Sequence, residues 1–310
     1  MKKTFTVATR GGALASVQTQ FIVSQLSQLN PGLQFVIKNV TTEGDKDRRT
    51  TLWELKSSGF FTSQIEDCLL AGEADLAVHS FKDMPTSQRE GLAVTAVLDR
   101  RFPQDCLVAG DKVSSIDNLP PAARIGTSSL RRTVQIRRLR ADIVTAPIRG
   151  NVATRIRYLE EGDFDAVILA RAGLERLGMG GKMSVCFDTQ QFIPSPAQGA
   201  LAVQTRSNDA ATMQLVAAID DKKVRLVTSA ERHILEVTQC GCHAPVGAFA
   251  AVCGDDIIID AFISDTEGRR FIRQDIRGPA DDALKLADKL AKGLLDAGGK
   301  EILKLLAHGS

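Results

Sequence analysis

A turn that holds two neighbouring cysteines is the first candidate for chemistry in this chain. It reads QCGCHAPVG over residues 239–247. The thiol of Cys242 could anchor a group covalently, because the flanking Gly241 lets the backbone approach such a group closely. A buried, inert thiol is the structural alternative. We expect no metal, because the two-residue spacer and the second Cys/His pair of a zinc site are missing.

An arginine-rich stretch is the second candidate, and it begins with the segment GTSSLRR at residues 126–132. The chain from Thr127 to Ser129 leads into an expected helix, so its N–H groups and hydroxyls can meet an anion. Forked guanidinium groups then suit carboxylates. Read alone, the segment fits a serine N-cap with solvated arginines better, but further arginines near the next loop favour a ligand with several carboxylates. The arginines of the stretch are Arg131, Arg132, Arg137, Arg138, Arg140, Arg149, Arg155 and Arg157.

The third candidate is the carboxylate of Asp83, in the segment HSFKDMP at residues 79–85. Residues 74–79 read as a strand, so Ser80, Lys82 and Asp83 follow its carboxyl end, where open α/β sheets bind their ligands. A carboxylate there can stabilise a developing positive charge or move a proton. Two structural alternatives stay open. Asp83 is a turn residue before the proline, or it pairs with Lys82, which would lower its pKa.

Composition excludes several classes of function. The 310 residues are 44% hydrophobic and 25% charged, with a net charge of +2, which fits a globular protein of two or three domains without a field that recruits nucleic acid or membrane. No apolar core of a signal peptide and no membrane-length apolar run is present, so we expect a cytoplasmic protein whose six cysteines stay reduced. An RNA-binding role for the arginines is disfavoured by the single Tyr and single Trp.

Short β-rich runs alternate with helical patterns through the first two-thirds of the chain, which predicts α/β domains with mostly parallel strands. From about residue 220 the pattern predicts an α+β domain. His79, in an apolar strand, is expected to be a hydrogen-bonded structural residue. Expected strands cover residues 4–9, 33–41, 74–79, 106–109, 124–126, 164–170, 200–204, 247–252, 257–263 and 270–276. Expected helices include residues 60–70, 224–237, 280–295 and 300–306, and one that starts at residue 130.

Taken in order, these segments resemble the porphobilinogen deaminase (hydroxymethylbilane synthase) family over nearly the whole chain. The resemblance implies two α/β lobes like those of type II periplasmic binding proteins, residues 1–99 with 197–219 and residues 100–196, and a C-terminal α+β domain, residues 220–310. It implies a monomeric, cytoplasmic transferase that joins four porphobilinogen molecules into linear hydroxymethylbilane and releases ammonia. Its product would enter tetrapyrrole (haem-type) synthesis by passing to the next pathway enzyme.

The resemblance also assigns roles to residues. Cys242 would carry a dipyrromethane cofactor, two linked porphobilinogen units, through a thioether. Asp83 would stabilise the cationic azafulvene that forms when porphobilinogen loses ammonia, with Lys82 as a second catalytic residue. The other cofactor-binding residues would be Ser80, Lys82, Thr127, Ser128, Ser129, Arg131 and Arg132, and the substrate-binding residues would be Arg10, Arg149, Arg155 and Arg176.

The chain departs from the family pattern at three places. Gly12 stands where serine is usual, Ser58 stands where a loop lysine is expected, and Gln204 stands where glutamate is common. Lys56 lies two residues before Ser58 and could replace the missing cation. Two alternatives therefore stay open, a degraded deaminase paralogue and a non-catalytic, two-lobed carboxylate-binding protein. The mass of the intact protein separates a covalently primed enzyme from a simple binder.

Overall fold

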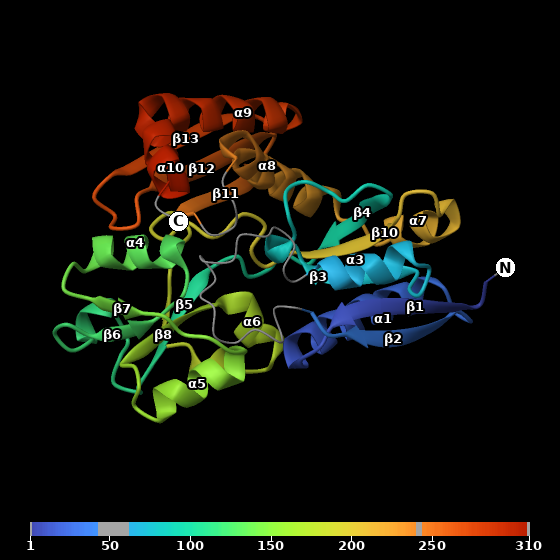
Figure 1. Ribbon diagram of the computed structural model, residues 1–310, viewed down its shortest axis with the longest axis horizontal. Helices are drawn as coiled ribbons and strands as arrows, with labels where there is room; N and C mark the ends of the chain where they lie inside the picture. Colours follow the sequence, from blue (N-terminus) through green and yellow to red (C-terminus); the bar gives the residue numbers. More distant parts are fainter. Residues whose placement is uncertain (1, 43–61, 240–243, 309–310) are drawn as a thin grey trace. The chain divides into compact units, whose positions relative to one another are not determined.

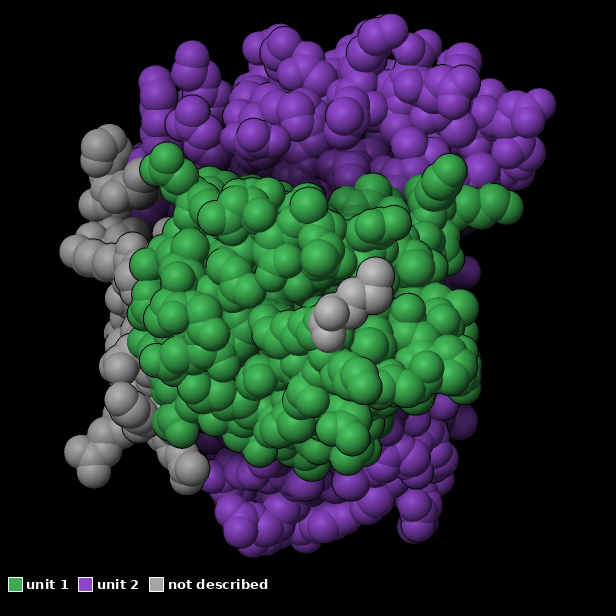
Figure 2. Space-filling view, turned by 90° about the vertical axis from the view of Figure 1, so that its right-hand side faces the viewer, with its two compact units in different colours: residues 1–48, 57–101, 199–225 green, residues 49–56, 102–198, 226–310 purple. Residues whose placement is uncertain are grey.

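The computed structural model describes residues 2–42, 62–239 and 244–308. The chain divides into two compact units, shown in different colours in Figure 2. Unit 1 comprises residues 1–48, 57–101 and 199–225, and unit 2 comprises residues 49–56, 102–198 and 226–310. The three predicted domain ranges stay a prediction, because this division groups the second and third of them in one unit.

Unit 1 is built on a mixed five-stranded sheet with the order β2-β1-β3-β10-β4 (Figure 1). β1 pairs in parallel with β2 and β3, whereas β10 runs antiparallel to both β3 and β4. Its elements are β1 (Thr4–Arg10), α1 (Ala13–Leu29), β2 (Gln34–Val40), α3 (Ser63–Leu70), β3 (Leu76–Ser80), η2 (Phe81–Asp83), β4 (Leu92–Leu98), β10 (Leu201–Arg206) and α7 (Ala210–Ala217).

Helices cover both faces of this sheet because its strands alternate their apolar side chains. On β1, Val7 joins Ile22 and Leu26 of α1 in one core cluster, while Ala8 joins Ile65 of α3 in another. Each of these five residues is at most 1% exposed. The strands are therefore anchored from both sides, and the loops at their ends are left to carry polar side chains.

The first part of unit 2 contains a second mixed sheet, with the order β7-β6-β8-β5-β9. Here β6 is parallel to β7 and β8, whereas β5 is antiparallel to β8 and β9. The elements are β5 (Asp105–Ala109), η3 (Ile116–Asn118), β6 (Arg124–Gly126), α4 (Leu130–Leu139), β7 (Val144–Ala146), α5 (Val152–Glu160), β8 (Ala166–Ala170), α6 (Arg171–Arg176), η4 (Gly180–Lys182) and β9 (Val185–Cys186).

The C-terminal part of unit 2 is an antiparallel sheet, β11-β12-β13, with helices packed on it (Figure 1). One apolar cluster joins the inner face of the three strands to α8, α9 and α10. The elements are α8 (Lys222–Thr238), whose first residues belong to unit 1, β11 (Val246–Cys253), β12 (Asp256–Ser264), β13 (Phe271–Pro279), η5 (Ala280–Asp282), α9 (Ala283–Leu294), the π-helical η6 (Leu295–Gly299) and α10 (Lys300–His308).

The predicted fold class is confirmed: the chain forms two mixed α/β lobes and a C-terminal domain with an antiparallel sheet. The expectation that most lobe strands are parallel is wrong. Among the described residues, two of the four pairings in each lobe sheet are antiparallel. Alternating β and α patterns reveal which segments are strands, but strand direction is set by where each connection crosses the sheet. No helix within the described ranges is long and apolar enough to cross a membrane.

The loop before α1 bears on one departure from the family pattern. Gly12 is the N-cap of α1, with φ +112° and ψ 156° and no side-chain cap. This region of backbone space is open almost only to glycine. A serine at this position would therefore be strained, so Gly12 is required by the backbone path that this chain takes into α1.

We predict that Gly12→Ser lowers the free energy of unfolding by about 1–3 kcal/mol, because a side chain at this φ is strained. Urea unfolding followed by circular dichroism measures the change. Gly11→Ser is the matched control, because Gly11 has no such φ and nothing within 4 Å of a built Cβ. Equal stability of the two variants would show that the backbone before α1 can adjust to a side chain at position 12 without strain.

Candidate active site

One group of predicted site residues lies at a single edge of the unit 1 sheet. β1 and β3 are parallel neighbours, so their carboxyl ends meet at this edge. Arg10 is the last residue of β1 and Ser80 the last residue of β3, and η2 follows at once with Lys82 and Asp83. The predicted position after a strand's carboxyl end is confirmed for Lys82 and Asp83, whereas Ser80 is still the last residue of the strand.

The Asp83 carboxylate is exposed at the end of η2. In the part of the chain that the structure describes, no hydrogen bond or ion pair to this carboxylate is found, including the pairing with Lys82 that the sequence left open. Lys82 is half-buried. Asp83 is thus an available anion next to a cation on a well-anchored turn.

Gln18 is a site residue that sequence reasoning missed. Its side chain is 4% exposed on α1, where it donates to the Ser80 hydroxyl at 2.9 Å, and the hydroxyl donates back to the Gln18 amide oxygen at 3.1 Å. These alternative bonds fix the Ser80 side chain against α1. The signal was a polar residue on the buried stripe of α1, where an apolar residue would be expected.

A buried polar chain lies beside this edge and explains Gln204. His79 Nε2 lies 3.1 Å from Gln204 Oε1, and Gln204 Nε2 donates to Glu66 Oε1 at 3.0 Å. Burial lowers the pKa of His79 to about 4. The neutral imidazole can then donate to the amide oxygen while the amide N–H donates to the carboxylate. A glutamate at position 204 could not donate in this way, so the departure from the family pattern fits its surroundings. His79 has the structural place predicted for it.

A second group of predicted residues lies at one edge of the first sheet of unit 2. Thr127, Ser128 and Ser129 follow β6, and Ser129 is the N-cap of α4. The Ser128 hydroxyl donates to the carbonyl of Ile148 at 2.7 Å and accepts from its N–H at 3.0 Å. These bonds tie the loop after β6 to the loop after β7. Ser128 therefore holds the second loop in place, and its hydroxyl is already engaged.

Arg149 sits in the loop after β7 with unmet hydrogen-bonding capacity. Its Nε and Nη2 atoms are buried and have no hydrogen-bond partner among the described residues. The next residue, Gly150, has φ +104°, and a Cβ there would lie 2.6 Å from Thr154 Cγ2, so only glycine fits. Arg155 Nε donates to the Gly150 carbonyl at 2.9 Å. Buried N–H groups without acceptors are costly, so the Nε and Nη2 groups of Arg149 favour an anionic ligand at this loop.

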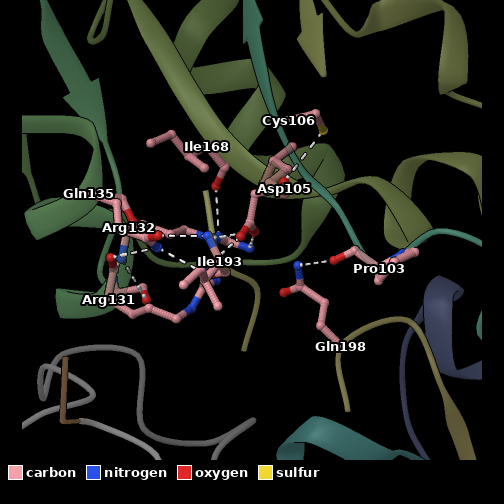
Figure 3. A network of polar contacts seen from close by, with 12 residues as sticks. Pro103, Asp105, Cys106, Arg131, Arg132, Gln135, Ile168, Ile193 and Gln198 are labelled. Carbon is pink, nitrogen blue, oxygen red and sulfur yellow. Dashed lines mark hydrogen bonds and ion pairs between the residues drawn. The ribbon is translucent and has the colours of Figure 1, made fainter. Parts of the chain in front are cut away.

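Arg131 and Arg132 share one buried carboxylate, that of Asp105 (Figure 3). Arg131 Nη1 lies 2.7 Å from Asp105 Oδ2, and Arg132 Nη2 lies 2.7 Å from Asp105 Oδ1. Both arginines also donate at 2.8 Å to main-chain carbonyls, Arg131 to Ile193 and Arg132 to Ile168. Asp105 is fully buried, and the arginines are 5% and 6% exposed. Sequence reasoning missed Asp105, which lies far from the arginines in the chain.

The two arginines differ in what remains for a ligand. Arg131 uses only Nη1 in these contacts, which leaves its Nε and Nη2 groups without a hydrogen bond among the described residues. Arg132 uses Nε, Nη1 and Nη2. Burial lowers the pKa of Arg131 and Asp105 opposes that shift, so the guanidinium stays charged. Arg131 is therefore suited to bind a ligand carboxylate, whereas Arg132 has mainly structural contacts.

Other predicted residues are less well defined by their contacts. Arg176 ends α6 and is half-buried. Cys242, the predicted anchor, lies outside the described residues, as do Lys56 and Ser58. Within the described residues, no group of three or more His, Cys, Asp or Glu side chains could hold a metal ion.

The donor set fits a group with several carboxylates, such as the predicted dipyrromethane. The orphaned buried atoms of Arg149 and the remaining N–H groups of Arg131 lie on the loops and helix that follow β7 and β6, which are parallel neighbours. Guanidinium groups bind carboxylates in pairs of parallel hydrogen bonds. The described residues thus define an α/β protein of two lobes with a C-terminal antiparallel-sheet domain and guanidinium donors for an anionic ligand.

Comparison with known families makes the class specific. Residues 5–214 match the family model "Porphobilinogen deaminase, dipyromethane cofactor binding domain", and residues 226–296 match "Porphobilinogen deaminase, C-terminal domain". The chain belongs to the porphobilinogen deaminase family.

Curated relatives align with nearly the whole chain. The porphobilinogen deaminase of Xanthomonas axonopodis pv. citri is 39% identical over 300 residues, which cover 97% of this chain and 98% of that protein. The porphobilinogen deaminase of Roseiflexus sp. is 40% identical over 303 residues, covering 98% and 99% of the two chains.

Similar solved structures include binding proteins of low sequence identity. The methionine-binding protein MetQ is 10% identical, with a TM-score of 0.45 over 75% of this chain and 96% of that chain. The periplasmic aliphatic sulphonate binding protein SsuA from Escherichia coli is 14% identical, with a TM-score of 0.41 over 77% and 71% of the two chains.

We predict that Asp105→Asn lowers the free energy of unfolding by about 3–5 kcal/mol, because it leaves two buried guanidinium charges without their shared carboxylate. Urea unfolding measures the change. Asp256→Asn is the matched control, since Asp256 and Arg277 form an exposed ion pair whose loss should change stability far less. Similar losses in the two variants would show that Asp105 does not organise this region.

Proposed function

We propose that this chain is a hydroxymethylbilane synthase, which joins four porphobilinogen molecules into a linear tetrapyrrole with release of ammonia. The observation that carries the proposal is the family match over both parts of the chain, at about 40% identity to full-length deaminases. The geometry adds unpaired guanidinium donors on one sheet edge and an available carboxylate on another. These are the charges that a substrate with two carboxylates and a cationic reaction intermediate requires.

The arginines bind and orient the carboxylates of cofactor and growing chain in this proposal. Arg131 offers its Nε and Nη2 groups, and Arg149 offers Nε and Nη2, which have no acceptor among the described residues. Arg10, Arg155 and Arg176 complete the substrate contacts. Thr127 and Ser129 add polar groups at the start of α4, while Ser128 holds the loop of Arg149. Orientation of this kind lowers the barrier by placing reacting atoms before the reaction begins.

The dipyrromethane, held by a thioether to Cys242, would supply the primer on which the new rings are added. Arg131 would hold its carboxylates, with help from Ser80 and Lys82, and the contacts of Arg132 with Asp105 would keep Arg131 in place. Because the primer stays attached, the growing chain stays with the protein between additions.

In this proposal the Asp83 carboxylate stabilises the positive charge that develops during the reaction. Loss of ammonia from porphobilinogen leaves a positive charge centred on the pyrrole N–H, and an adjacent carboxylate stabilises that charge. The same carboxylate can carry a proton to the departing amine and take one from the attacked ring carbon. Asp83 has no competing partner among the described residues, and Lys82 beside it would hold a substrate or cofactor carboxylate. We further propose a cytoplasmic monomer whose product passes to the next enzyme of tetrapyrrole synthesis, as the family resemblance implies.

The anchor assignment is tested by intact mass. We expect the purified wild-type protein to carry a covalent surplus equal to one dipyrromethane, and Cys242→Ser to lack both the surplus and activity. Cys240→Ser is the matched control and should keep both. A full surplus on Cys242→Ser would move the anchor to another residue, and a wild-type protein without any surplus would favour the non-catalytic binder.

The role of Asp83 is tested by turnover. Asp83→Asn removes the charge at nearly constant shape, so kcat should fall at least roughly a hundredfold, on the order of 3 kcal/mol, with a smaller effect on binding of the first substrate. Asp83→Glu keeps the charge and should retain more activity than Asp83→Asn. Near-normal turnover in Asp83→Asn would return this residue to a turn-forming role.

A further inference from the structure

Two cysteines that are far apart in the sequence face each other across neighbouring strands. Cys106 on β5 pairs directly with Cys186 on β9 in an antiparallel register. Directly opposed residues of antiparallel strands point to the same face of the sheet. The two thiols therefore project side by side, although 80 positions separate them in the chain.

The local hydrogen bonds show which kind of antiparallel pair the two cysteines form. Phe187 donates its N–H to the carbonyl of Asp105 at 3.1 Å. Asp105 and Phe187, which lie next to the two cysteines on their strands, therefore form a hydrogen-bonded pair. Cys106 and Cys186 are then a non-hydrogen-bonded pair, with Cα atoms about 4.5 Å apart and side chains close together. Disulfides span Cα separations of about 4.4–6.8 Å, and a pair of this kind lies within that range.

The surroundings give the two thiols different roles. Cys186 is exposed, and Arg171 Nη1 lies 3.7 Å from its sulfur. Its exposure leaves this sulfur open to oxidants in solution. Cys106 is fully buried and directs its thiol to the Leu169 carbonyl at 3.4 Å. Burial raises the pKa of Cys106 to about 12, Asp105 adds to that shift, and Arg132 and Arg171 oppose it.

We propose that Cys106 and Cys186 form a redox site, in which a hydroperoxide oxidises Cys186 and Cys106 then closes a disulfide. This inference goes beyond the proposed reaction and does not depend on it. In the first step the Cys186 thiolate attacks the peroxide, a sulfur–oxygen bond forms, the oxygen–oxygen bond breaks, and the leaving alkoxide or hydroxide takes up a proton. In the second step the Cys106 sulfur displaces water from the sulfenic acid of Cys186, and its own proton leaves with that water.

The balance is two thiols and one hydroperoxide to one disulfide, one water and one alcohol, or two waters when the oxidant is hydrogen peroxide. The second step is slow, because only the small thiolate fraction of Cys106 attacks. The sulfenic acid on Cys186 should therefore accumulate before the link forms. The link should form roughly tenfold faster for each pH unit between 7 and 9, as the Cys106 thiolate fraction rises. The bond would lie one residue from Asp105, the carboxylate that holds Arg131 and Arg132.

The test treats the full chain with hydrogen peroxide, blocks remaining thiols with N-ethylmaleimide at low pH, and digests with trypsin without reduction. Cleavage after Lys and Arg places Cys106 alone in peptide 102–112 and Cys186 alone in peptide 183–206. We expect these peptides to appear as one disulfide-linked species that dithiothreitol separates. Dimedone added early should label Cys186.

Variants complete the test. Cys186→Ser and Cys106→Ala should lose the link, and Cys106→Ala should accumulate the oxidised Cys186 instead. Cys253→Ser is the matched control, because Cys253 is an exposed thiol at the end of β11 without a cysteine opposite it, and this variant should link as wild type does. The proposal is overturned if Cys186 advances to sulfinic acid without linking, or if it links to a cysteine other than Cys106.

Discussion

One buried carboxylate, that of Asp105, pairs with two arginines at the start of α4, and the arginine-rich edge of this protein depends on it. Two guanidinium charges could not be buried at 5% and 6% exposure without an opposite charge and carbonyl acceptors. Once Nη1 of Arg131 is fixed between Asp105 and Ile193, its remaining N–H groups have a set direction. Arg132 completes the contacts with Asp105 and Ile168. The donor for a ligand is thus oriented by its contacts with Asp105 and Ile193.

Both lobes present their polar residues by the same rule. Strands that are parallel neighbours end at one edge, so short polar segments after each strand come together although they are distant in sequence. In unit 1 this edge carries Arg10, Ser80 and Asp83, and in unit 2 it carries Ser129 and Arg149. The strands themselves are held by apolar side chains on both faces. Such anchored strands allow the loops to keep costly features, such as unsatisfied guanidinium atoms and glycine-only backbone angles.

The departures from the family pattern read differently once their neighbours are known. Gln204 accepts from a neutral histidine and donates to a carboxylate. An amide can do both, whereas a second carboxylate could only accept. Gly12 stands at a backbone angle that serine adopts only with strain. Both substitutions therefore belong to self-consistent local structures, which weakens the alternative of a degraded paralogue. Compared with the family pattern alone, each substitution reads as the loss of a functional group. The packing around each residue shows why the residue that is present fits.

The sequence alone determined the order of elements and the segments that carry chemistry, because periodicity, apolar runs and short polar motifs are local properties. The strand at residues 124–126 and the helix start at residue 130 were predicted to the residue, and Ser80, Lys82 and Asp83 were placed at a strand end. The motifs also identified the family. Only the tertiary structure decided strand direction, the partnership of Asp105 with Arg131, the support of Ser80 by Gln18, and the facing of Cys106 and Cys186. Each of these joins residues that lie far apart in the chain, and such contacts are fixed by how sheets close and helices pack, which local sequence patterns do not encode.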